Sequence, residues 1–294
     1  MIAGGSGFLG RKLAQRLETD GHKAITLSRR PSGAGNQIAW QPDGRAGALT
    51  RHFDGVDAIV NLAGEGIADK RWTAARKDAL RNSRILSTRT LARAVTECAR
   101  PPKVFISGSA IGYYGPHGDE PVTESTPPGD DFLARLCVEW EEEARKVESS
   151  ATRLAIVRTG LALDRDGGAL KKMLLPFKLG LGATMGSGDQ YMPWIHAADW
   201  TALVSWMIQN DRATGAFNAT APAPVTNRMF TRTLGRVLRR PAVLHAPAFV
   251  LSAALGELAS ALVHGQRVLP AAAEQLGFRF TYRELEPALA SLNL

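Results

Sequence analysis

Three glycines near the start of the chain constrain its fold more than any other feature. Gly4, Gly7 and Gly10 lie three residues apart in GGSGFLG, between a short apolar run and a predicted helix at residues 11–18. In a dinucleotide site the first such glycine permits a tight turn, the second lets the backbone approach a pyrophosphate, and the third lets the helix pack on the sheet. The free N–H groups of the helix N-terminus then attract the phosphate charge. A plain strand–helix turn is the alternative.

The composition is typical of a cytoplasmic globular protein. The 294 residues are 45% hydrophobic, which is enough for one large or two modest domains. The two cysteines provide neither a disulfide framework nor a metal cluster, as expected in a reducing compartment. The longest apolar stretch, residues 247–263, is too short to span a bilayer comfortably, so we expect no membrane partner.

The basic charge of the chain is mild and dispersed. The net charge is +8, but the densest runs of Lys and Arg are only pairs, such as Arg29-Arg30 and Arg239-Arg240. A nucleic-acid-binding protein usually concentrates its basic residues in a patch or stripe. We therefore expect a small-molecule substrate, and no nucleic acid, as partner.

The chain begins abruptly. Met1 runs straight into the glycine turn, so we expect no signal peptide. A buried first strand usually has about five residues, whereas only residues 1–3 precede this turn. This shortness favours a true start upstream of Met1.

Apolar runs alternate with helical stretches along the chain, which predicts a Rossmann-like, doubly wound parallel α/β sheet. Strands are predicted at residues 23–28, 37–41, 56–62, 103–107, 153–158 and 217–219, and helices at 74–98, 132–148 and 194–209. Asp130 and Asp131 are placed to cap the second of these helices. We expect an NADP-binding domain at residues 1–165, whose sheet also receives later segments. A smaller, mostly helical substrate-side region would follow at 166–294.

The strand predicted at residues 23–28 ends where a cofactor ribose would lie. An acidic residue at this point favours NAD, whereas Arg29 suits the 2′-phosphate of NADP, because a guanidinium matches the geometry of phosphate oxygens. The alternative is a solvated strand end. Further along, Arg84 either reaches the cofactor phosphates or lies on a solvated helix face.

Two hydroxyl groups are the catalytic candidates. The strand predicted at residues 103–107 runs into SGSAIGYYG, which would enter the cleft above the nicotinamide. A hydroxyl there can exchange a hydrogen bond with a substrate oxygen, so we select Ser109 first and Tyr113 second, with ordinary turn residues as the alternative. His196 and Asp199 lack the further partners of a metal site, so we interpret both as structural and predict no metal.

At this point the chain resembles the atypical extended short-chain dehydrogenases/reductases. More narrowly, it resembles the YfcH-like branch of the NAD-dependent epimerase/dehydratase family, which includes the human epimerase family protein of the 39U class. The stretches that carry the resemblance are GGSGFLG (4–10), SRR (28–30), NLAGE (61–65), RW (71–72), SR (83–84), LPFKLGLG (175–182), GSGDQ (186–190), WIH (194–196) and NATAP (218–222).

The resemblance implies a Rossmann-like fold with NADP bound at its N-terminal part. Joined to the candidates above, the positions carried over give the predicted cofactor-binding set: Gly4, Gly7, Phe8, Leu9, Gly10, Ser28, Arg29, Arg30, Leu62, Ala63, Gly64, Arg84, Ser107 and Leu161. The sequence departs from active members at the Tyr-x-x-x-Lys pair, whose two positions hold Phe132 and Leu136. Neither the acid–base hydroxyl nor the ammonium group is therefore present.

These observations predict an NADP(H)-dependent oxidoreductase or nucleotide-sugar-type epimerase of unknown substrate. The alternative is a catalytically silent NADP-binding protein that senses redox state or scaffolds a partner. A homodimer through the helices after strands four and five, common in the superfamily, is one option for its assembly.

Overall fold

A seven-stranded parallel sheet forms the centre of the molecule, in the order β12-β7-β5-β4-β1-β2-β3. The structure is a computed structural model that describes residues 1–33, 35–149 and 151–294. The strands of this sheet are β1 (Ile2–Ala3), β2 (Thr26–Ser28), β3 (Gln37–Ala39), β4 (Ala58–Asn61), β5 (Val104–Ala110), β7 (Arg153–Thr159) and β12 (Gly215–Ala219). The predicted Rossmann-like α/β fold is confirmed.

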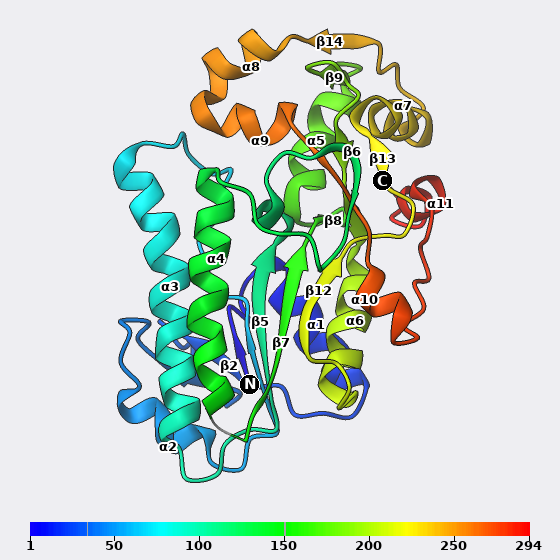
Figure 1. The fold of residues 1–294 in the computed structure, drawn as a ribbon. Coiled ribbons are helices and arrows are strands. Elements are labelled where there is room, and N and C mark those ends of the chain that lie inside the picture. Colours follow the sequence, from blue (N-terminus) through cyan, green and yellow to red (C-terminus); the bar gives the residue numbers. More distant parts are fainter. Residues whose placement is uncertain (34, 150) are drawn as a thin grey trace.

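Helices cover both faces of the sheet (Figure 1). One face carries α1 (Phe8–Thr19) and α6 (Ala197–Gln209), and the other carries α3 (Ala74–Glu97), α4 (Phe132–Arg145) and the short α2 (Thr50–Phe53). Neighbouring strand residues point to opposite faces: Ile106 packs with Leu13 and Trp200, whereas Phe105 packs with Leu91. Burial on both faces explains why these strands read as continuous apolar runs in the sequence.

The helix α4 begins where the sequence predicted it. The Asp131 carboxylate accepts a hydrogen bond from the Ala134 N–H at 2.8 Å, which satisfies one of the donors left free at a helix start. The helix ends at Arg145 and continues as a 3-10 turn, Lys146–Ser149, before β7. Strand β5 runs three residues beyond its predicted end, which places Ser109 inside the sheet, opposite Arg158 of β7.

Most of the remaining elements lie beyond the end of the sheet toward which β5 and β7 point, whereas residues 271–275 lie beside β12 (Figure 1). The short strands pair as β10 (Tyr191–Met192) with β13 (Val225–Thr226), β11 (Trp194–His196) with β8 (Leu161–Leu163), β14 (Leu244–Ala246) with β9 (Ala183–Met185), and β15 (Gln266–Val268) with β6 (Gly118–Val122). The helices are α5 (Gly168–Lys178), α7 (Asn227–Leu238), α8 (Ala248–Leu255), α9 (Ser260–Val263), α10 (Ala271–Gln275) and α11 (Leu285–Ala290). Further 3-10 turns are Gly47–Leu49, Ile111–Tyr114 and Gly256–Ala259.

Two polar residues at the start of α6 hold the C-terminal part of the chain. The Asp199 carboxylate accepts hydrogen bonds from the backbone N–H groups of Thr281 (3.0 Å) and Tyr282 (2.8 Å). His196 Nδ1 accepts from the Ala198 N–H, and its ring lies 3.9 Å from that of Tyr282, centroid to centroid. Burial lowers the pKa of His196, which favours the neutral ring that this bond requires. Both residues are structural, as the sequence predicted.

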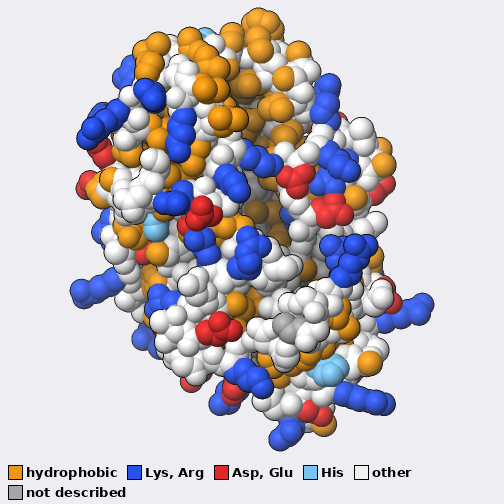
Figure 2. All heavy atoms as spheres, turned by 180° about the vertical axis from the view of Figure 1, so that it is seen from behind, with side chains coloured by type: hydrophobic (Ala, Val, Ile, Leu, Met, Phe, Trp, Pro, Cys, Tyr) orange, Lys and Arg blue, Asp and Glu red, His pale blue; other side chains and the backbone are white. Residues whose placement is uncertain are grey.

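Apolar side chains are unevenly distributed over the surface. Seen from behind, Lys and Arg side chains are scattered over the molecule, whereas apolar side chains gather at one end (Figure 2). In the part of the chain that the structure describes, no helix has the length and hydropathy to cross a membrane.

Candidate cofactor and active site

The glycine turn leaves the N-terminus of α1 open. Gly4 has a φ of +78°, and a Cβ there would lie 2.6 Å from the Leu62 carbonyl oxygen. A Cβ on Gly10 would lie 2.2 Å from the Gly4 carbonyl oxygen, so neither position tolerates a side chain as the backbone stands. The cap residue Gly7 contributes no side chain, and its carbonyl accepts from the Arg11 N–H at 3.0 Å. The N–H groups of the first helical turn therefore remain available to an anion.

The loop between β8 and α5 flanks this open turn. A Cβ on Gly167 would lie 2.1 Å from the ring of Phe8, which shows how closely the loop backbone approaches the first turn of α1. Lys12, also on α1, forms an ion pair with the buried Asp164 of the loop at 2.6 Å. Leu161 begins β8 and lies opposite Trp194 of β11. The structure thus brings Phe8 and the segment after β7 to one side of the glycine turn.

The strands next to β1 end beside the turn. Ala63 donates its N–H to the side-chain oxygen of the buried Asn61 at 3.1 Å, and the amide nitrogen of Asn61 donates to Thr88 at 2.8 Å. Ser107 lies opposite Asn61 in the register of β4 and β5, and it is fully buried. Asn61, which was not among the predicted residues, therefore fixes the backbone of the segment that follows β4.

The end of β2 presents two free cations. Ser28 closes the strand, and its hydroxyl accepts from the Arg30 N–H at 3.2 Å. Arg29 and Arg30 are exposed, and neither forms an ion pair with any residue that the structure describes. Because β2 pairs in parallel with β1, these arginines lie one strand away from the glycine turn.

Arg84 turns inward from α3 rather than toward solvent. Its guanidinium donates to the carbonyls of Leu80 (3.0 Å) and Glu65 (2.9 Å), and it lies 5.3 Å from the ring centroid of Trp140. A Cβ on Gly64 would lie 3.2 Å from Arg84 Cζ, so the guanidinium packs on the backbone after β4. Burial lowers the pKa of Arg84. The solvated face considered for this residue is not what the structure shows.

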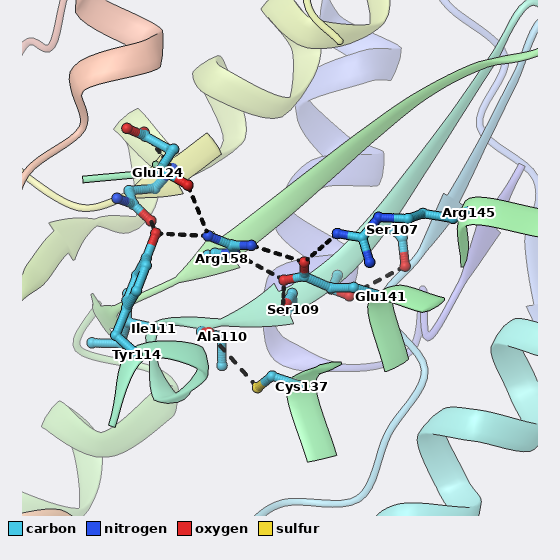
Figure 3. A network of polar contacts seen from close by, with 12 residues as sticks. Ser107, Ser109, Ala110, Ile111, Tyr114, Glu124, Cys137, Glu141, Arg145 and Arg158 are labelled. Carbon is cyan, nitrogen blue, oxygen red and sulfur yellow. Dashed lines mark hydrogen bonds and ion pairs between the residues drawn. The ribbon is translucent and has the colours of Figure 1, made fainter. Parts of the chain in front are cut away.

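A buried ion pair occupies the other end of the sheet edge (Figure 3). Arg158 binds both carboxylate oxygens of Glu141, at 2.8 and 2.9 Å, and the two side chains are 3% and 0% exposed. Ser109 donates its hydroxyl to the same carboxylate at 2.8 Å, and Arg145 adds a contact at 3.1 Å. Burial opposes the charge of Arg158, but Glu141 outweighs it and raises the pKa of the guanidinium.

The network continues from Arg158 into the two tyrosines after β5. Arg158 donates to the Tyr114 hydroxyl at 2.9 Å, and that hydroxyl donates to the side-chain oxygen of Asn218 at 2.6 Å. Burial raises the pKa of Tyr114 to about 12, so its phenol stays protonated at neutral pH. The guanidinium carbon of Arg158 also lies 3.5 Å from the ring centroid of Tyr113. Arg158 thereby positions both aromatic side chains.

The two positions expected for a Tyr-x-x-x-Lys pair hold apolar side chains, although Lys77 Nζ lies 5.2 Å from the ring centroid of Phe132. Phe132 packs edge-on against Trp72, with ring centroids 5.3 Å apart, and Leu136 is buried. Phe132 also borders a hollow of about 230 Å³ between the start of α4 and the Gly256–Val263 region. The residues that line this hollow are Trp72, Asp131, Phe132, Leu133, Glu257, Ser260 and Ala261.

Cys137 lies beside the end of β5. Cys137 of α4 is buried, and its thiol lies 3.7 Å from the Ala110 carbonyl oxygen. Burial, helped by the charge of Glu141, raises the pKa of Cys137 to about 12. Over residues 1–33, 35–149 and 151–294, no three acidic, His or Cys side chains gather in a way that could hold a metal ion.

Sequence reasoning missed the ion pair. A signal was present, because Arg158 interrupts the apolar strand RLAIVRT and Glu141 follows directly on the apolar stripe of α4. A charge embedded in a buried run needs a partner of opposite sign. Which carboxylate would meet the arginine depended on how α4 packs against β7, and the sequence does not contain that information locally.

Comparison with known proteins assigns the family. Residues 1–220 match the NAD dependent epimerase/dehydratase family. The chain belongs to this family. Residues 246–292 match a second family, described as a domain of unknown function (DUF1731). The family predicted from the sequence is confirmed.

Relatives of this chain cover nearly its full length. The epimerase family protein Mb2239 from Mycobacterium bovis is 40% identical over 290 residues, which span 98% of this chain and 95% of that protein. The crystal structure of human epimerase family protein SDR39U1 (isoform 2) with NADPH has a TM-score of 0.93 at 36% identity, covering 99% of this chain and 97% of that one. A nucleoside-diphosphate sugar epimerase from Corynebacterium glutamicum has a TM-score of 0.81 at 34% identity, covering 98% of this chain and 56% of that one.

Proposed function

We propose that this protein is an NADP(H)-dependent oxidoreductase or nucleotide-sugar-type epimerase whose substrate is unknown. The observation that carries the proposal is the start of α1, which has no side-chain cap, together with Arg29 and Arg30 one strand away, which form no ion pair with a described residue. An open helix N-terminus accommodates a diphosphate, and a neighbouring arginine distinguishes a 2′-phosphate from a hydroxyl. The human relative crystallised with NADPH supports the same choice.

Each predicted contact has a position compatible with this cofactor. The first turn of α1, with Phe8 and Leu9, would bind the diphosphate, and Ser28, Arg29 and Arg30 would bind the 2′-phosphate. The backbone after β4 (Leu62, Ala63 and Gly64), supported by Arg84, would lie beneath the cofactor. Ser107 and Leu161 would border its nicotinamide half. When bound, NADP(H) supplies the hydride acceptor or donor, and the chain has to orient the substrate oxygen.

We assign that second task to Ser109 and Tyr113. The hydroxyl of Ser109 donates its proton to Glu141 in a hydrogen bond, so its oxygen can only accept a hydrogen bond from a substrate hydroxyl. Tyr113 is only half-buried, and no hydrogen bond of its hydroxyl is found in the described structure. The guanidinium of Arg158 lies 3.5 Å from the centroid of its ring, a positive charge where the usual pair has a lysine.

The second candidate is a catalytically silent NADP-binding protein that senses redox state or scaffolds a partner. The observation that favours it is the apolar pair of positions at Phe132 and Leu136, together with the commitment of Ser109 to a buried ion pair. Such a protein would keep the cofactor contacts and lack turnover.

Calorimetric titration with NADPH, NADP and NADH tests the cofactor. We expect Arg29→Ala to weaken NADPH binding about 10- to 100-fold, since a hydrogen bond to a charged group contributes about 1.5–3 kcal/mol, and to leave NADH binding unchanged. Arg51→Ala is the matched control, because Arg51 is exposed on α2 and makes no ion pair among the described residues. Equal losses for both cofactors, or no binding at all, would refute the proposal.

Turnover separates the two candidates. A panel of carbonyl compounds and nucleotide sugars is assayed with NADPH and NADP. If the protein is an enzyme, Tyr113→Phe should remove turnover while NADPH affinity is retained. If the protein is catalytically silent, the wild type should show no turnover on any member of the panel.

A further inference from the structure

The end of the molecule that carries α8 exposes large apolar side chains. The helix α8 (AFVLSAAL) contains no buried residue, and Phe249 is 74% exposed. Val243, just before it, is 83% exposed. We call the exposed apolar residues of this end the apolar cap: Leu175, Leu179, Leu181, Met229, Val243, Leu244, Phe249 and Val250. Figure 2 shows apolar side chains gathered at one end of the molecule.

The cap brings together segments that are distant in sequence. Strand β14, which contains Leu244, pairs with β9, and the main chain of Leu244 bonds to that of Gly182. A Cβ on Gly180 would lie 3.5 Å from Pro241, so the segment after α5 lies against the segment before β14. Monomeric proteins rarely expose contiguous apolar surface of this kind without a binding role.

Unpaired cations border the cap. The side chains concerned are Lys171, Lys178, Arg232, Arg239 and Arg240. All five are exposed, and none forms an ion pair with another residue that the structure describes. Lys171 and Lys178 lie on the same face of α5 as Leu175, four and three residues away.

Three acidic side chains at this end of the molecule already have cationic partners. Asp189 pairs with Arg228, at 3.2 Å, and Glu286 pairs with Arg236, at 2.6 Å. Glu257 pairs with Lys77. The border of the cap therefore carries positive charge without compensation.

We propose that the apolar cap binds the surface of a membrane that contains anionic lipids. Apolar side chains such as Phe249 and Val243 would enter the boundary between headgroups and acyl chains, and the bordering cations would bind the lipid phosphates. A second copy of the chain fits less well, because a two-fold contact would bring two sets of the same unpaired cations together. The expectation of no membrane partner rested on the lack of a spanning segment, and peripheral binding needs none.

Vesicle co-sedimentation tests this inference. The full chain is mixed with vesicles of phosphatidylcholine alone or of phosphatidylcholine with phosphatidylglycerol, at low and high salt. We expect binding to the anionic vesicles, weakened by salt. Phe249→Ser with Val243→Ser should abolish it, and Arg239→Glu with Arg240→Glu should weaken it roughly thirtyfold.

A matched charge reversal, Arg51→Glu on α2 at the opposite end of the molecule, should leave vesicle binding unchanged (Figure 1). Retained NADPH binding shows that the variants are folded. Failure of the wild type to bind anionic vesicles, or equal binding to neutral ones, would overturn the proposal. A dimer in light scattering that Phe249→Ser with Val243→Ser dissociates would assign the cap to a second copy instead.

Discussion

Two neighbouring regions at the edge of the central sheet differ in how their polar groups are satisfied. At the glycine turn the backbone itself is the functional group, and side chains are excluded by contacts as close as that between Gly10 and the Gly4 carbonyl. At the ends of β5 and β7 the side chains are the functional groups, and Glu141 and Arg158 satisfy each other within the protein. The first region leaves donors free for a ligand. In the second region the donors of Arg158 bind Glu141 and Tyr114, and its guanidinium packs on the ring of Tyr113.

The largest expected effect is on the ion pair. Glu141→Gln should lower the free energy of unfolding by about 3–5 kcal/mol, because it leaves the guanidinium of Arg158 buried without a counter-charge. Glu139→Gln is the matched control on the same helix, since its pair with Arg81 is exposed and should contribute less than about 1 kcal/mol. Urea denaturation measures both. Similar losses would mean that the buried Glu141–Arg158 pair does not differ from the exposed Glu139–Arg81 pair as described.

Gly10→Ala probes the backbone region. The added methyl group would meet the Gly4 carbonyl, so we expect a loss of about 1–3 kcal/mol in stability from overpacking, together with loss of NADPH binding. Gly35→Ala, where a Cβ has open space, should change neither. Thermal unfolding and calorimetry report the two quantities. Unchanged NADPH affinity in Gly10→Ala would argue against the turn as the phosphate site.

Asp131→Ala tests how α4, which carries Glu141, is held at its start. Loss of the bond to the Ala134 N–H should cost about 1 kcal/mol. The neighbouring Asp130 is exposed and caps nothing in the described structure, so Asp130→Ala should stay within about 0.5 kcal/mol. Denaturation midpoints compare the two variants. A larger loss of stability for Asp130→Ala would contradict the assignment of Asp131 as the N-cap residue of α4.

The smallest effect concerns alkaline pH and only the side-chain region. Tyr114 has a pKa of about 12 in the folded protein, against about 10 in an unfolded chain. The unfolded state therefore loses its proton first, and stability should fall as the pH rises above about 10. Between about pH 9 and pH 10.5, the free energy of unfolding should decrease less in Tyr114→Phe than in the wild type, by a difference below about 1 kcal/mol. Tyr191→Phe is the control, and an unchanged slope in Tyr114→Phe would contradict the burial of this phenol.

The same contrast explains what the sequence could predict. Glycine spacing reports directly on a backbone turn, and apolar periodicity located every strand of the central sheet within a few residues. The start of α1 was placed at residue 11 because Gly10 was assigned to the turn, whereas the missing Cβ of Gly10 lets the first helical turn begin at Phe8.

The side-chain region could not be predicted in the same way. Ser109 was expected at a strand end in the cleft, but β5 continues to Ala110 and places the hydroxyl on Glu141, 32 residues further along the chain. Strands such as β14 and β15, of three residues each, are too short to show a period of two, so the region at 166–294 was predicted as mostly helical. The cofactor and catalytic roles of the predicted residues remain predictions.

The polar bonds that reach into the C-terminal segment have a consequence for the stability of the whole chain. Asn218 donates to the Leu269 carbonyl at 2.9 Å, and Glu124 accepts from the Ala272 N–H at 3.1 Å. Both side chains belong to the part of the chain that matches the dehydratase family, whereas their partners belong to the part that matches the second family. A chain shortened before residue 246 would lose both bonds, and Asn218 and Glu124 would keep only their partners within the first segment. The C-terminal segment therefore supplies polar partners to the core of the first segment, and its removal should destabilise that core.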